Sequence, residues 1–128
     1  MEYYHSKKIK ETNFEKAVEQ VIDALKKEGF GVLTQIDIKE TLKKKLDEDF
    51  RPYMILGACN PPYAFKALTA EDKIGTMLPC NVIVQQVDDG IEVASINPVA
   101  SMQAVHNQNL HSIANEIKEK LERAVDSL

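Results

Sequence analysis

Two segments of the chain carry apolar residues at the spacing of one buried helix face. The first starts at Thr12-Asn13-Phe14-Glu15, a capping-box pattern with Thr12 as the cap, and stops at Gly29. The second fills the C-terminal segment 110–128. The stripes are Phe14, Ala17, Val18, Val21, Ile22 and Leu25 in the first, and Leu110, Ile113, Ala114, Ile117, Leu121, Ala124, Val125 and Leu128 in the second. This spacing predicts two helices that each pack one face against a core.

Short apolar runs between these helices have the length of strands. Residues 2–10 form a weakly patterned first candidate, and residues 30–36 form a second in which alternate side chains share one face. Residues 52–58 are almost continuously apolar, which predicts a central strand covered on both faces. A fourth strand, 81–87, leads to Asp89-Gly90, a pair that predicts a two-residue hairpin loop and a fifth strand after it.

Three further polar-to-apolar transitions predict helix starts. Asp37 opens a charged helix through Leu46, whose thin apolar stripe places it on the surface. Asn60 is a good N-cap because its side-chain oxygen can accept from first-turn N–H groups, and the next residue is the proline favoured at the first helical position. The buried face of that helix is predicted to be Ala64, Phe65 and Leu68. Asn97-Pro98 repeats the same arrangement at another strand end.

Taken in order, these elements predict a single α+β domain over residues 1–128. The expected order is β-α-β-α-β-α-β-β-α, with a mixed or antiparallel sheet of about five strands and helices on one face. A chain of 128 residues is long enough to bury about two-thirds of its unfolded surface in one core.

Composition narrows the class of protein. A net charge of −4 and a pI near 5.4 argue against a nucleic-acid partner, which would need a basic face. No stretch approaches 18 uninterrupted apolar residues, and residues 1–8 lack a signal-peptide apolar segment, so we expect a soluble, cytoplasmic protein that does not enter a membrane. Its cysteines are then expected to be reduced.

Both cysteines of the chain occur where a predicted strand meets another element. Cys59 ends the central strand directly before the Asn60-Pro61 helix start, and Cys80 follows Pro79 at the start of the next strand. Free N–H groups at a helix N-terminus favour negative charge, and they can lower the pKa of a nearby thiol. If the two strands are neighbours, Cys59-Asn60-Pro61 and Pro79-Cys80-Asn81 form one rim.

Three functional hypotheses follow from this rim. In the first, Cys59, Asn60, Cys80 and Asn81 bind a small anionic or thiol-reactive ligand. In the second, the protein is a thiol redox or sulfur-transfer enzyme with Cys59 as nucleophile and Cys80 as resolving thiol. In the third, both cysteines are core residues and the protein acts through a partner surface.

A metal site is a lesser alternative at the same rim. Cys59, Cys80 and His106 would supply the soft ligands that zinc or copper(I) prefers. The residues single out no cofactor, and they do not decide whether any reaction is catalysed.

The motifs around the cysteines resemble a known family. Cys59-Asn60-Pro61 and Leu78-Pro79-Cys80-Asn81, together with Thr34-Gln35-Ile36-Asp37, Leu56-Gly57-Ala58 and the Asp89-Gly90 hairpin, are similar in order to the bacterial and archaeal family catalogued as domain of unknown function 302. The resemblance covers residues 14–102. It implies a small α+β domain that forms a homodimer, with no established biochemical activity. Asn97-Pro98 departs from the family pattern, in which an acidic residue is expected before the proline.

Overall fold

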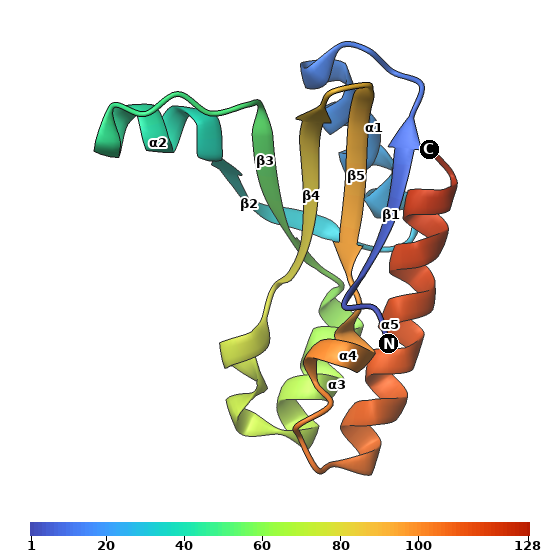
Figure 1. The fold of residues 1–128 in the computed structure, drawn as a ribbon. Helices are drawn as coiled ribbons and strands as arrows, with labels where there is room; N and C mark the ends of the chain where they lie inside the picture. Colours follow the sequence, from blue (N-terminus) through green and yellow to red (C-terminus); the bar gives the residue numbers. More distant parts are fainter.

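A five-stranded antiparallel sheet forms the centre of the fold in a computed structural model that describes residues 1–128 (Figure 1). The strand order is β1-β5-β4-β3-β2, and every neighbouring pair is antiparallel. The prediction of an α+β fold with about five strands is therefore confirmed, and the sheet is antiparallel rather than mixed. The strands are β1 (Tyr4–Ile9), β2 (Gly31–Asp37), β3 (Tyr53–Cys59), β4 (Cys80–Val87) and β5 (Gly90–Ile96).

The helices cover one face of the sheet and one of its ends. The two long helices, α1 and α5, pack against the same face, and the opposite face is left open (Figure 1). Helix α2 lies beyond the sheet edge next to β2, and no residue of it is buried, as its thin stripe predicted. The helices are α1 (Phe14–Lys27), α2 (Ile38–Leu46), α3 (Pro61–Ala70), α4 (Pro98–Ser101) and α5 (Gln108–Asp126), with a 3₁₀ helix, η1 (Asp72–Met77), after α3.

Side-chain caps define most of the helix starts. Asn13, not the expected Thr12, caps α1, because its Oδ1 accepts a hydrogen bond from the Lys16 N–H at 3.0 Å. Asp37 caps α2 through the Glu40 N–H, as expected. Gly29 follows α1 with a φ of +88°, a left-handed conformation that glycine adopts without steric cost.

The sheet departs from the sequence prediction in two places. The β4–β5 hairpin loop is Asp88-Asp89 rather than Asp89-Gly90, because Gly90 already pairs with Val87. In β2, the register shifts between Val32 and Thr34, so Leu33 is a bulge. A bulge shifts the alternation of side chains by one residue, so Thr34 and Ile36 face away from the side that Phe30 and Val32 occupy.

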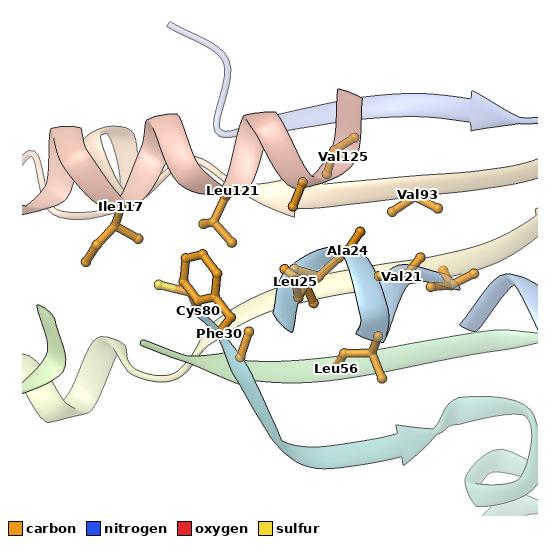
Figure 2. Close-up of a cluster of buried hydrophobic side chains, with 14 of the residues drawn as sticks. Val21, Ala24, Leu25, Phe30, Leu56, Cys80, Val93, Ile117, Leu121 and Val125 are labelled. Carbon is orange, nitrogen blue, oxygen red and sulfur yellow. The ribbon is translucent and has the colours of Figure 1, made fainter. Parts of the chain in front are cut away.

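The core is a single cluster of 23 buried apolar residues between the inner sheet face and the helices. Figure 2 shows the row from Ile117 through Leu121 to Val125 along α5, facing Leu25 of α1 and Val93 of β5. Cys80 belongs to this cluster and lies beside the ring of Phe30 (Figure 2). Burial of each large apolar side chain stabilises the fold by roughly 1.5–3 kcal/mol, so this layer supplies most of the stability.

Helix α3 presents a different face to the core from the one predicted. Its buried residue is Ala67, whereas Phe65 is 73% exposed and Leu68 is also exposed. The helix lies at the end of the sheet and contacts α5, and Tyr63 and Ala70 of α3 also pack against the core while Phe65 faces solvent. No helix of the chain is long and apolar enough to cross a membrane.

Candidate functional site: an apolar cavity beside both cysteines

The ends of β3 and β4 and the helices α3 and α5 enclose a cavity of about 230 Å³. Both cysteines line it, so the prediction that Cys59 and Cys80 lie close together at one rim is confirmed. Asn60 carries the only polar side chain among the lining residues apart from the two thiols. The residues of this cysteine cavity are Phe30, Leu33, Ala58, Cys59, Asn60, Ala64, Ala67, Leu68, Leu78, Pro79, Cys80, Met102, Leu110, Ile113, Ala114 and Ile117.

Sheet pairing brings the cysteines together. Strands β3 and β4 are neighbours, and Ala58 lies directly opposite Cys80. Cys59 is the next residue along β3, immediately before the chain turns into α3. The Cys80 side chain points into the core layer and is only 6% exposed, whereas Cys59 is half-buried.

A glycine permits the close approach of the strands at this point. A Cβ atom on Gly57 would lie 2.2 Å from Thr34 Oγ1 and 2.8 Å from Pro79 Cγ. Any larger residue would push β2 and the Pro79 turn away from β3. The position of Pro79 in the cavity wall therefore depends on Gly57.

Asn107 holds the two helical walls together. Its Nδ2 donates to the Ala70 carbonyl at the end of α3 at 2.8 Å, and its Oδ1 accepts from the Asn109 and Leu110 N–H groups at the start of α5. One side chain therefore caps α5 and fastens it to α3. Sequence reasoning missed this residue, although an asparagine shortly before an apolar stripe is an N-cap signal.

The mouth of the cavity is apolar and open to solvent. The bulge in β2 places Leu33, which is 68% exposed, in the cavity lining, and Leu68 of α3 is the other exposed lining residue. Bulges commonly redirect a side chain next to a functional site. Phe65, one turn before Leu68 on α3, extends the exposed apolar surface next to the mouth.

The two thiols differ in their surroundings. Burial, and to a smaller extent the nearby Cys59, raise the pKa of the Cys80 thiol to about 11. Removal from water disfavours the thiolate, so Cys80 stays protonated at neutral pH. Cys80 is therefore a weak nucleophile, and Cys59 is the more exposed of the two thiols.

Asn60 occupies the N-cap position of α3, but its side chain does not cap the helix. Its Nδ2 donates instead to the Glu28 carbonyl after α1, at 3.1 Å. Pro61 and Pro62 are the first two residues of α3 and carry no N–H, so this N-terminus offers few donors to an anion. The prediction that the Asn60 side chain caps this helix is therefore wrong, and few N–H groups remain for the anion-binding corner that the sequence predicts.

Two other predicted site residues lie elsewhere. Asn81 is exposed and lines a shallow depression on the open face of the sheet with Tyr53 and Ile83, because successive residues of a strand point to opposite faces. His106 is exposed in the segment between α4 and α5 and does not line the cavity. No three His, Cys, Asp or Glu side chains lie close enough together to hold a metal ion, so the structure does not assemble the Cys59, Cys80 and His106 site.

Comparison with known proteins places the whole chain in one family. No curated protein matched the sequence. A crystal structure described as an uncharacterized conserved protein DUF302 from Bacillus stearothermophilus is 30% identical, with a TM-score of 0.90 over 97% of this chain and 96% of that one. The family model described as "Domain of unknown function DUF302" matches residues 5–128, beyond the 14–102 over which the sequence motifs suggested it. The chain belongs to the DUF302 family.

Proposed function

We propose that this protein binds a small, uncharged and largely apolar molecule in the cysteine cavity, in contact with Cys59. The observation that carries the proposal is a cavity of about 230 Å³ whose lining has a single polar side chain besides the thiols. An apolar cavity of roughly 150 Å³ is large enough to bind benzene. The cysteine cavity therefore has room for a substituted aromatic ring or a short branched chain.

The lining favours one of the two ligand classes expected from the sequence. A charged group buried among apolar side chains loses its hydration without a partner, which is costly. Helix α3 starts with two prolines and does not supply the N–H groups that would offset this cost. The cavity therefore suits a neutral, thiol-reactive ligand better than an anionic one.

An electrophilic ligand could bond to Cys59. In a conjugate addition, sulfur bonds to one alkene carbon and the thiol proton ends on the other, so no further reactant is needed. The redox alternative needs Cys80 as the resolving thiolate, and the raised pKa of Cys80 disfavours that role. Reversible binding with Cys59 in contact is thus the better supported function.

The experiment is alkylation of native protein by N-ethylmaleimide with and without toluene. We expect maleimide to modify Cys59 and spare Cys80, and saturating toluene to slow the modification several-fold and raise the Tm. Cys59→Ser should abolish labelling and keep the toluene-induced rise in Tm. An unchanged labelling rate together with an unchanged Tm would remove the proposal. The intact mass of never-reduced protein, two hydrogens lighter, would instead support the redox alternative.

We also propose that the protein is a homodimer whose subunits meet through the open face of the sheet. Ile36, Ile55 and Ile83 are opposite one another on β2, β3 and β4, and they form an apolar row on this face. Tyr3 and Tyr4, at the start of β1, add exposed aromatic rings to this face. Five strands of six to eight residues give a flat footprint of roughly 500 Å², and pleated side chains bring it near the about 800 Å² per partner typical of stable interfaces.

Light scattering of two charge variants tests this interface. Ile83→Glu places a charge at the centre of the proposed interface and should yield monomers. Phe65→Glu is the matched control, because Phe65 is exposed on α3 away from the open face, and it should remain dimeric. A monomeric wild-type protein, or a dimer that only Phe65→Glu disrupts, would contradict the proposal.

A further inference from the structure

The chain contains two Asn-Pro corners that differ in the hydrogen bonding of the asparagine side-chain oxygen. Asn60 follows the last residue of β3, and Asn97 follows the last residue of β5; each precedes a helix that begins with proline. Each asparagine is 7% exposed. The two corners are therefore matched in residue type, position and burial.

The Asn97 side chain has partners for both of its polar atoms. Its Oδ1 accepts from the Val99 N–H at 3.0 Å and the Ala100 N–H at 3.4 Å, which caps α4. Its Nδ2 donates to the Glu2 carbonyl at 3.0 Å. The hydrogen-bonding groups of the Asn97 side chain are therefore satisfied by the protein itself.

The Asn60 side chain has a partner for only one of its polar atoms. Nδ2 donates to the Glu28 carbonyl, but no protein group donates to Oδ1. The sequence explains the difference, because the second residue of α4 is Val99, with an N–H, whereas the second residue of α3 is Pro62, without one. An N-cap oxygen normally accepts from the second or third helical residue. The double proline and the bond to Glu28 leave the Asn60 oxygen without this use.

Water can reach Asn60 Oδ1, because Ser95 Oγ is the only buried side-chain oxygen or nitrogen that lacks a hydrogen-bond partner. A ligand that displaces this water and offers no donor leaves the oxygen unpaired, which costs free energy that a donor on the ligand recovers. Asn60 lines the cysteine cavity, where every other side chain is apolar or a thiol. We infer that the natural ligand of the cavity is a neutral molecule with one hydroxyl or N–H group, which donates to Asn60 Oδ1. This inference rests on the proposed function and adds the ligand's polar group and its position.

Three ligands of nearly equal shape test the inference. Phenol has a donor, anisole has an oxygen but no donor, and toluene has neither. In nuclear magnetic resonance titrations of the wild-type protein, the dissociation constant of phenol should be about tenfold or more lower than those of anisole and toluene. Without an acceptor in the cavity phenol would bind more weakly than toluene, because its hydroxyl would lose its hydration without gaining a hydrogen bond.

Two variants locate the acceptor. In Asn60→Ala the preference for phenol should disappear while toluene binding persists. Asn97→Ala removes the matched asparagine outside the cavity and should retain the preference. If Asn60→Ala does not fold, the relative affinities of the three ligands for the wild-type protein still test whether the ligand must carry a donor.

The outcomes separate this inference from the function on which it rests. Equal affinities, or toluene binding more tightly than phenol, would overturn the donor requirement and leave the cavity as a binding site. Binding of none of the three would overturn the proposed function itself. A phenol preference that survives in Asn60→Ala would also overturn the inference, because another group would then accept the hydrogen bond.

Discussion

The layer between the sheet and α5 is filled at one end and hollow at the other. Toward the C-terminus of α5, Ala124 and Val125 meet Val21, Ala24 and Leu25 of α1 with no room for a water molecule. Toward its N-terminus, Leu110, Ile113 and Ile117 face the cysteine cavity. The same apolar stripe of one helix thus serves two purposes, because α1 ends before it reaches the second half of the stripe.

This difference separates stability from function along a single helix. A filled layer gains dispersion contacts on all sides, whereas a hollow one gives up some of these contacts and leaves room for another molecule. The cysteines lie at the hollow end, with Cys80 at the boundary between the two ends. The predictions below test whether the two ends differ as described.

The largest expected effect is the loss of stability when a leucine at each end of α5 is truncated to alanine. Leu121 and Leu110 are both fully buried on α5, but only Leu110 lines the cavity. Leu121→Ala should lower the free energy of unfolding by about 4 kcal/mol and Leu110→Ala by about 2.5 kcal/mol, because Leu110 already faces empty space. Urea denaturation measures both, and equal losses would contradict the comparison.

A second effect appears at alkaline pH. The Cys80 pKa of about 11 in the folded protein lies above its ordinary value of 9.0. The unfolded chain therefore loses this proton first, so the contribution of Cys80 to stability is fully present below pH 9 and falls between pH 9 and 11, by about 2.7 kcal/mol in total. Urea midpoints at pH 8 and 10.5 measure the loss, and Cys80→Ala should lack it. An identical pH dependence in that variant would show that other groups cause it.

Replacing one alanine by leucine at each end of α5 should have a smaller effect on stability. Here added volume, rather than lost volume, should be more costly at the filled end. Ala124→Leu adds volume where there is no space and should destabilise the fold by about 1–3 kcal/mol. Ala114→Leu adds the same volume toward the cavity and should cost less than about 1 kcal/mol while abolishing toluene binding. Thermal denaturation with and without toluene measures both, and toluene binding retained in Ala114→Leu would place the site elsewhere.

The smallest difference is expected between the two Asn-Pro corners. Asn97→Ala removes a helix cap and a buried hydrogen bond, and it should cost about 2 kcal/mol. Asn60→Ala removes one hydrogen bond and should cost about 1 kcal/mol. If chemical denaturation finds Asn60→Ala the more costly substitution, Asn60 has a structural role that its single bond does not reveal.

Much of the fold could be predicted from the sequence because local patterns determine it. The stripes of α1 and α5, the apolar run at 52–58 that became β3, and Asp37 as a cap each depend on residues close in the chain. The bulge at Leu33 and the Asp88-Asp89 loop could not, because strand register depends on pairing with distant residues.

The position of the site could be predicted from the sequence, but the apolar lining of its cavity could not. Two cysteines at neighbouring strand ends located it, but part of the lining comes from α5, whose stripe looks uniform in sequence. The anion-binding prediction overlooked a local signal, since Pro61 and Pro62 together remove the N–H groups of an N-terminus. Asn81 was assigned to the wrong face because its neighbour Cys80 was the residue that points inward.

The most direct test is an intermolecular nuclear Overhauser experiment with phenol bound to the wild-type protein. The account predicts contacts from the ring protons to the methyl groups of Leu110, Ile113 and Ile117, which line the cysteine cavity. Contacts confined to Ile55 and Ile83 on the open face, or no contacts at saturating phenol, would contradict it.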